Sequence, residues 1–338
     1  GRYVVACIKS EMDKGKKIIL RTENLCKWFP VGTEWNHGIT RKYLKAVNGV
    51  TLDVAEGETL GIVGESGCGK TTFGRTILKL EEPTSGKIFF EGTDITNYNY
   101  KDMQKIRRKL QFIFQDPYAS LDPRMHVGEC IGEPYVIQNM YPDAEERKAE
   151  VVKLMRKCGL SENDYKKFPH EFSGGQRQRI GIARALTLKP DLLVCDEPVS
   201  ALDVSVQAQL INLMLDLQKE YKLTMIFISH DLSVISHVAD RIVVMYLGKV
   251  VELADKEEIF KNTLHPYTQA LLSSVPIIGK QGSLNQKLME GDLPSAVNLP
   301  SHCPFYGRCP RQCGECREKE APTLREVLPR HYVSCYLI

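Results

Sequence analysis

Short apolar runs alternate with longer amphipathic stretches along most of the 338-residue chain. Residues 59–63 form an apolar run that ends at a glycine, which is the form of a buried strand. Further on, the pattern predicts helices over residues 176–188 and 204–221 and strands over residues 192–195 and 224–229. Strands that alternate with helices favour an α/β fold with a largely parallel sheet.

Three segments depart from this pattern. Residues 1–17 are charged and have no period, so we predict an N-terminal tail there. Residues 116–172 lack a clear buried strand but contain a charged helical stretch, which indicates an inserted helical subdomain. After residue 275 the periodicity fades and prolines become frequent. The predicted organisation is therefore one domain over residues 18–275, followed by a C-terminal extension over residues 276–338.

The composition is that of a soluble globular chain, with 43% hydrophobic and 26% charged residues. No apolar run approaches the roughly 18 residues that a membrane-spanning helix needs. Residues 1–10 do not have the pattern of a signal peptide. The net charge is only +3, so a general nucleic-acid-binding surface is not expected.

A glycine-rich segment follows the strand predicted at residues 59–63. Gly64 to Thr71 fit the pattern G-x-x-x-x-G-K-[ST], ahead of a helix predicted over residues 70–80. Glycines let backbone N–H groups curl around phosphate oxygens, and the helix N-terminus adds partial positive charge. In this pattern Lys70 reaches the β- and γ-phosphates, and the Thr71 hydroxyl binds Mg²⁺. We expect the nucleotide to be bound by Gly64, Glu65, Ser66, Gly67, Cys68, Gly69, Lys70, Thr71 and Thr72, with Cys68 as a small filler.

A pair of acids ends the strand predicted at residues 192–195. Asp196 and Glu197 lie at the carboxyl edge of the predicted sheet, where ligands bind in open α/β folds. Asp196 is suited to hold Mg²⁺ through water, and Glu197 is suited to polarise an attacking water. Adjacent acids after a strand are, alone, more often a helix N-terminal charge pair. The intact phosphate loop favours the catalytic interpretation.

Many nucleotide hydrolases share these two sites, and the segment just ahead of the second one is more specific. Residues 172–179 read Phe-Ser-Gly-Gly-Gln-Arg-Gln-Arg and resemble the signature motif of ATP-binding-cassette (ABC) ATPases, with Phe172 where leucine is most common. Other family elements follow the expected order: Gln115 matches the Q-loop, Asp203 the D-loop and His230 the switch histidine. The resemblance covers about residues 20–275.

The resemblance implies a P-loop ABC cassette, which is a RecA-like parallel-sheet core with an antiparallel β subdomain and an inserted helical subdomain. In the family two cassettes pack head to tail, and each ATP lies between the phosphate loop of one and the signature helix of the other. The signature residues here are Ser173, Gly174, Gly175 and Gln176, with Asp203 beside them.

The family also implies roles around the γ-phosphate and the adenine. Glu197 and His230 act on the attacking water and the γ-phosphate, while Gln115 meets the Mg²⁺ and couples the nucleotide to the helical subdomain and a membrane partner. An aromatic side chain stacks on the adenine. We predict Phe29 for this role, with Trp28 and Tyr43 as alternatives because residues 31–42 resemble an insertion.

Several longer sequence segments resemble segments of the ATPases of oligopeptide/dipeptide importers. They are FQDPYASLDPR at 114–124, ALDVS at 201–205 and HPYTQALL at 265–272, and residues 175–180 resemble the F-type subunit. The resemblance implies a peripheral ATPase on the cytoplasmic face of the membrane. Its implied partners are a second, D-type ABC ATPase, two membrane permeases and an extracytoplasmic substrate-binding protein.

Three other functions stay open. One is import of nickel or another small solute, since nickel importers share much of these segments. The second is a non-transport ABC ATPase that acts on nucleic acid or ribosomes. Its basic patch would be Lys105, Arg107, Arg108 and Lys109, although we favour a solvated helix face for them. An iron–sulfur redox sensor in which ATP is regulatory is a third possibility.

Five of the 11 cysteines lie in the last 36 residues. An odd number of cysteines without a secretory segment points to metal or redox chemistry rather than disulfides. Cys303, Cys309, Cys316 and Cys335 are predicted to hold an iron–sulfur cluster or Zn²⁺. Similar tails in the importer family favour a [4Fe–4S] cluster, with Zn²⁺ as the alternative. Cys313 can replace Cys316 as ligand, and free thiols in a loose tail are the remaining interpretation.

The beginning of the chain resembles its end. Residues 2–7 read RYVVAC, and residues 331–335 read HYVSC. One hypothesis is that residues 1–10 end a preceding, similar cassette in a longer fused polypeptide. Chance similarity over six residues is the default explanation.

Overall fold

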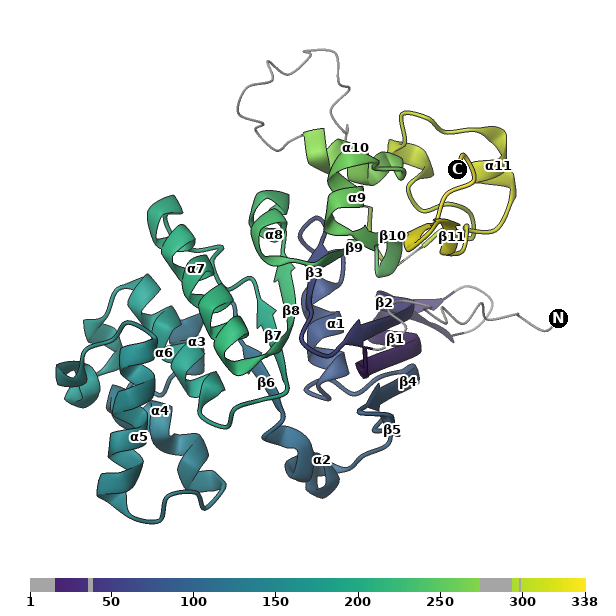
Figure 1. The fold of residues 1–338 in the computed structure, drawn as a ribbon. Helices are drawn as coiled ribbons and strands as arrows, with labels where there is room; N and C mark the ends of the chain where they lie inside the picture. Colours follow the sequence, from purple (N-terminus) through teal and green to yellow (C-terminus); the bar gives the residue numbers. More distant parts are fainter. Residues whose placement is uncertain (1–15, 36–38, 274–293, 298) are drawn as a thin grey trace. The chain divides into compact units, whose positions relative to one another are not determined.

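The computed structural model describes residues 16–35, 39–273, 294–297 and 299–338 (Figure 1). The chain divides into two compact units, one formed by residues 1–97 with 229–338 and the other by residues 98–228. The resemblance of residues 2–7 to the C-terminus falls outside the described residues.

The strand that leads into the phosphate loop belongs to a sheet to which the first unit contributes five strands. That strand, β3 (Thr59–Val63), matches the prediction, and all five of its residues are buried. It pairs in parallel with β9 (Arg241–Tyr246), which pairs antiparallel with β10 (Lys249–Asp255). Beyond β10 the sheet continues with β12 (His331–Val333) and then β11 (Arg325–Leu328). Every residue of β3 and β9 is buried. This is the pattern expected for parallel strands in an α/β fold, where both faces of the sheet are covered.

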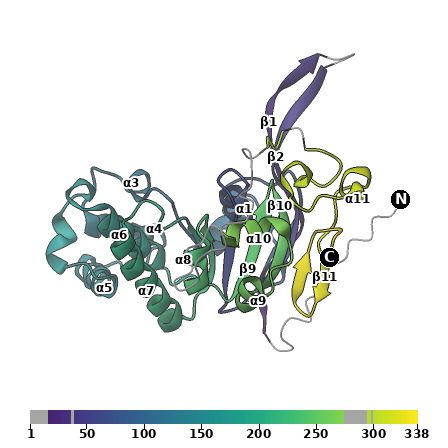
Figure 2. The ribbon, with the colours of Figure 1, turned by 90° about the horizontal axis from the view of Figure 1, so that it is seen from above.

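A second, antiparallel sheet belongs to the same unit. β1 (Ile18–Trp35) and β2 (Ile39–Ala55) form a long hairpin that extends beyond the rest of the unit in Figure 2. β4 (Ser85–Phe90) pairs with β1, and β5 (Thr93–Asp94) pairs with β4. The predicted insertion at residues 31–42 therefore lengthens this hairpin, whose side chains are described up to residue 32 and from residue 41.

Six helical segments of the first unit join these strands. They are α1 (Lys70–Ile77), α8 (Leu232–Val238), α9 (Lys256–Lys261), α10 (Pro266–Ser273), η3 (Tyr306–Arg308) and α11 (Gly314–Glu318). α1 is shorter than the helix predicted over residues 70–80. It ends because Lys79 adopts the left-handed conformation with φ 54°, which stops an α-helix.

The second unit combines a parallel sheet with a group of helices. β6 (Leu110–Ile113), β7 (Leu192–Asp196) and β8 (Thr224–Ser229) pair in parallel in this order. Its helices are α2 (Tyr100–Arg107), α3 (Pro117–Ser120), α4 (Val127–Ile137), α5 (Ala144–Lys157), η1 (Glu162–Lys166), η2 (Pro169–Glu171), α6 (Gly174–Leu186) and α7 (Val204–Tyr221). Residues 116–172, all of which the structure describes, contain helices and no strand, and α4 packs against α5 and α6 (Figure 1).

The C-terminal extension contains regular structure that the sequence pattern does not predict. β12 pairs with β10 through Val333 opposite Glu252 and Tyr332 opposite Leu253. His331 of β12 places Nε2 2.8 Å from the Glu252 carboxylate, and both side chains are fully buried. The same carboxylate accepts the backbone N–H groups of Leu264 and His265. A strand of three residues is too short to show a period, which is why the pattern fades there.

Among the residues that the structure describes, no helix is both long and apolar enough to cross a bilayer.

Replacing Glu252 with alanine is expected to lower the free energy of unfolding by about 3 kcal/mol, because a buried N–H group, a part-buried N–H group and a buried imidazole would lose their acceptor. Urea denaturation followed by circular dichroism measures this. Glu257→Ala, on the exposed side of α9, is the matched control and should change the value by less than about 0.5 kcal/mol. Equal stability of the two variants would contradict the role given to Glu252.

Candidate nucleotide site

The phosphate loop lies between β3 and α1, as the sequence predicts. Two of its glycines, Gly67 and Gly69, have positive φ angles of 81° and 106°, and Gly69 is the N-cap residue of α1. An added Cβ at Gly69 would lie 1.9 Å from the Ala46 carbonyl oxygen of β2, so only glycine fits. The loop thus turns tightly into the N-terminus of α1, with backbone free of side chains where phosphate oxygens bind.

The loop lysine is held by the loop itself. Lys70 Nζ donates to the carbonyl oxygens of Gly64 at 2.7 Å and Glu65 at 3.0 Å, and lies 3.9 Å from Cys68 Sγ. Burial raises the pKa of the Cys68 thiol although Lys70 opposes this, so the thiol stays protonated and acts as a small buried side chain. An ammonium already positioned inside a glycine-rich turn fits a site for nucleotide phosphates.

Glu65, the second residue of the loop, is bound by the C-terminal third of the chain. The Tyr267 hydroxyl accepts its backbone N–H at 2.9 Å, and the Arg308 guanidinium donates to both oxygens of its carboxylate at 3.0 and 3.1 Å. Sequence reasoning named Glu65 as a loop residue but missed both partners. They lie more than 200 residues away, and no spacing in the sequence connects them.

The acids of the second unit lie where the sequence places them, at the carboxyl end of β7. Asp196 is buried, and Glu197 is half-buried with a left-handed backbone of φ 44°. The Glu197 N–H donates to the Ile228 carbonyl at 3.0 Å, which fixes this strained residue next to β8. Gln115 Nε2 donates to Glu197 Oε2 at 3.1 Å. The structure therefore brings together the Q-loop glutamine and the predicted catalytic carboxylate.

The signature residues form the N-terminus of α6. Ser173 Oγ accepts the Gln176 N–H at 3.3 Å, and Gln176 Oε1 accepts the Ser173 N–H at 3.1 Å, which is a capping box. A Cβ at Gly175 would lie 2.5 Å from Val206 of α7, so a side chain there would push these two helices apart. Phe172, the departure from leucine, is buried. An exposed, capped helix start of this kind suits a phosphate.

Asp203 and His230 each precede a helix. Asp203 is exposed and caps α7 by accepting the Val206 N–H at 3.0 Å. His230 is exposed and comes one residue before Asp231, the N-cap residue of α8. Asp203 lies in the unit that carries Glu197, whereas His230 belongs to the unit that carries the phosphate loop. Their roles toward a nucleotide stay predictions.

The three aromatic candidates for adenine stacking lie on the β1–β2 hairpin. Trp28 and Tyr43 have ring centroids 6.4 Å apart, and Lys45 Nζ lies 4.9 Å from the Trp28 ring. Phe29 is the next residue along β1, so it points to the other face, with Lys27 Nζ 4.8 Å from its ring. The choice of Phe29 stays a prediction.

The five tail cysteines are free thiols in this structure. The Sγ atoms of Cys313 and Cys316 are 3.2 Å apart. Burial is the main cause of the raised pKa values of Cys303, Cys309, Cys316 and Cys335, and charge on neighbouring thiols contributes to each of them. No three His, Cys, Asp or Glu side chains in the described part of the chain are arranged to hold a metal ion. Two of the thiols approach each other, but the predicted four-ligand arrangement is not formed among the described residues.

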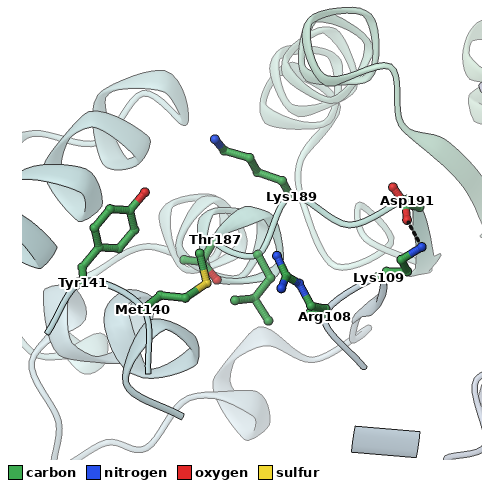
Figure 3. A pocket seen from close by; sticks show the side chains of 8 residues that line it. Arg108, Lys109, Met140, Tyr141, Thr187, Lys189 and Asp191 are labelled. Atoms are coloured by element: carbon green, nitrogen blue, oxygen red, sulfur yellow. Dashed lines mark ion pairs between the residues drawn. The ribbon is translucent and has the colours of Figure 1, made fainter. Parts of the chain in front are cut away.

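The basic patch formed by Lys105, Arg107, Arg108 and Lys109 is partly neutralised by acidic neighbours. Lys105 pairs with Asp102 at 2.9 Å, and Lys109 pairs with Asp191 at 3.4 Å. Arg108 and Lys109 line a pocket of about 480 Å³ together with Lys189, Thr187 and Tyr141 (Figure 3). The patch is therefore a surface of mixed charge rather than a continuous basic face.

Two family models match the sequence. Residues 47–200 match "ABC transporter", and residues 251–316 match "Oligopeptide/dipeptide transporter, C-terminal region". The Oligopeptide transport ATP-binding protein AppF of Bacillus subtilis is 50% identical over 328 residues, covering 95% of this chain and 98% of that protein. The Oligopeptide transport ATP-binding protein OppF of Salmonella typhimurium is 49% identical over 324 residues, covering 95% and 96%.

Solved structures show the same cassette fold. A dimeric ATP-binding cassette in a post-hydrolysis state, bound to ADP and Pi, has a TM-score of 0.64 and 28% sequence identity, covering 70% of this chain and 99% of that chain. The cbiO1 protein of Clostridium perfringens, part of an ABC transporter complex, has a TM-score of 0.62 and 28% identity, covering 73% and 92%. The P-loop ABC cassette predicted from the motifs is confirmed.

Proposed function

Because this chain belongs to the ATP-binding proteins of oligopeptide ABC transporters, we propose that it powers oligopeptide uptake through the residues described above. It is an ABC ATPase and the ATP-binding subunit of an oligopeptide importer. The observation that carries this is the identity of 50% along 95% of the chain, which includes the oligopeptide-specific C-terminal region. No feature of the described residues favours nickel or nucleic acid over peptide.

The proposed assembly has a second ATPase of the D type, two membrane permeases and an extracytoplasmic substrate-binding protein, with this subunit bound peripherally at the cytoplasmic face. Supporting it are the names of the relatives and the dimeric form of a similar cassette. The exposed start of α6 and the phosphate loop would each contribute half of a nucleotide site.

In the proposed mechanism Lys70 gives up the carbonyl oxygens of Gly64 and Glu65 and binds phosphate oxygens instead. Thr71 and Asp196 would hold Mg²⁺, which neutralises phosphate charge. Glu197 orients and polarises the attacking water. The hydrogen bond from Gln115 to Glu197 couples the position of the Glu197 carboxylate to the helical subdomain.

Replacing Lys70 with alanine should reduce ATP turnover by about 10²- to 10³-fold and weaken nucleotide binding, because the loop loses its one phosphate-directed ammonium. Phosphate release and equilibrium binding of ATP measure the two effects. Lys87→Ala, which removes an exposed lysine of β4, is the control. Unchanged nucleotide binding by Lys70→Ala would refute the phosphate-loop assignment.

Replacing Glu197 with glutamine is expected to lower turnover by about 10²- to 10⁴-fold while ATP stays bound. Glutamine keeps an acceptor for Gln115 but cannot polarise water as a carboxylate does. ATP should therefore trap a closed cassette dimer, which size-exclusion chromatography detects. Glu220→Gln on α7 should behave like the unmodified protein. Hydrolysis at the normal rate would exclude Glu197 as the base.

For the tail we propose a [4Fe–4S] cluster, with Zn²⁺ as the alternative, held by Cys303, Cys309, Cys316 and Cys335. What supports it is the concentration of five cysteines in the last 36 residues and the 3.2 Å approach of Cys313 to Cys316, which makes Cys313 a rival ligand. Binding would require that thiols with raised pKa values release protons and that the sulfur atoms move closer together.

Anaerobic purification followed by iron, sulfide and zinc analysis tests the tail site. The expected result is about four iron and four sulfide per chain, lost in a Cys303→Ser/Cys309→Ser variant. Stoichiometric zinc without sulfide would select the alternative. A folded, metal-free protein would refute both.

A further inference from the structure

The segment between Cys303 and Cys309 delivers an arginine to the phosphate loop. Arg308 ends the short helix η3, and its two terminal nitrogens donate to the two oxygens of the Glu65 carboxylate. The side chains are 10% and 24% exposed, so this pair is shielded from much of the solvent. A guanidinium that meets a carboxylate in this parallel geometry fixes both position and direction, which a single contact does not.

A buried aromatic cluster lies next to the arginine. The rings of Tyr246, Tyr267 and Phe305 lie within 4.7 to 5.5 Å of one another, and all three side chains are buried. Arg308 Nη1 donates to the Tyr246 hydroxyl at 3.5 Å, while the Tyr267 hydroxyl accepts the Glu65 N–H. The cluster thus joins β9, α10 and the extension into one support that holds Glu65 by its side chain and its backbone.

Glu65 in turn contacts the phosphate lysine. Its carbonyl oxygen accepts from Lys70 Nζ at 3.0 Å. Its carboxylate is a negative charge on the loop that, in the proposed function, receives a polyphosphate of the same sign, and like charges repel. An arginine paired with this carboxylate removes that repulsion and holds Glu65, and with it the loop backbone, in place.

We propose that Arg308 of the C-terminal extension is a positioning residue for the phosphate loop, which sets the affinity for ATP by neutralising and orienting Glu65. The inference rests on the proposed phosphate site and adds to it a contribution from the extension. Arg308 does not itself touch the nucleotide in this scheme. It acts through Glu65 on the loop and on Lys70.

Replacing Arg308 with alanine should raise the Kd for Mg–ATP about tenfold, as one unpaired and partly screened like charge would. The KM for ATP should rise in parallel, and kcat should change by less than about twofold because Glu197 is unaffected. Isothermal titration with Mg–ATP and steady-state phosphate release on the full chain measure these values. Arg317→Ala removes an exposed arginine of the same extension and is the matched control.

The double variant Arg308→Ala/Glu65→Gln tests whether Arg308 acts by neutralising the charge of the Glu65 carboxylate. Glutamine removes the unpaired carboxylate, so the Kd should return to within about threefold of the original value. An unchanged Kd in Arg308→Ala would overturn the proposal. An equal rise of the Kd in the single and the double variant would overturn it as well. Arg308→Lys keeps the positive charge but loses the two parallel hydrogen bonds of the guanidinium, so it should raise the Kd about two- to threefold. This variant replaces Arg308→Ala in the test if the alanine variant does not fold.

The result is distinguishable from a failure of the phosphate site itself. If Lys70→Ala still binds ATP normally, the loop assignment is wrong. If Lys70→Ala loses binding and Arg308→Ala does not, the loop assignment stands and only the role of Arg308 is refuted.

Discussion

The close approach of the phosphate loop to the backbone around it is the constraint on which the nucleotide site depends. Gly69 faces the Ala46 carbonyl of β2 without room for a Cβ, and the Gly248 N–H of the β9–β10 turn donates to the Cys68 carbonyl at 2.8 Å. The Asn48 N–H donates in turn to the Gly248 carbonyl. The loop is therefore fixed by two sheets at once. Its preorganisation means that nucleotide binding does not have to supply the cost of ordering the backbone.

The extension is part of this framework rather than an appendage. β12 continues the sheet that contains β3, the Glu252–His331 pair ties it to β10, and Arg308 reaches the loop from a neighbouring segment. These contacts connect the region typical of oligopeptide transporters to the part of the cassette that binds phosphate. A family-specific extension with this placement can tune a reaction that all ABC ATPases share.

Much of this architecture could be predicted from the sequence. Local patterns defined β3, β7, β8 and α7, because a buried strand or an amphipathic helix repeats over enough residues to be recognised. The motifs also located Gln115 and Glu197, which the fold brings into hydrogen-bonding contact. The partners of Glu65 could not be predicted, because Tyr267 and Arg308 meet it only through tertiary packing. The tail cysteines show the limit of such reasoning: spacing in the sequence does not fix how sulfur atoms converge, and the described residues do not form the predicted four-ligand site.

The place of β11 and β12 in the sheet has a consequence for solubility. β10 is flanked on its outer side by β12, and β11, with exposed Arg325 and Glu326, forms the last strand. A short, charged strand at the end of a sheet discourages pairing with other molecules. A chain shortened to end at α10 would instead expose the largely buried, seven-residue β10 as an unpaired edge. An unpaired edge of this kind offers its backbone N–H and C=O groups to other molecules and favours aggregation.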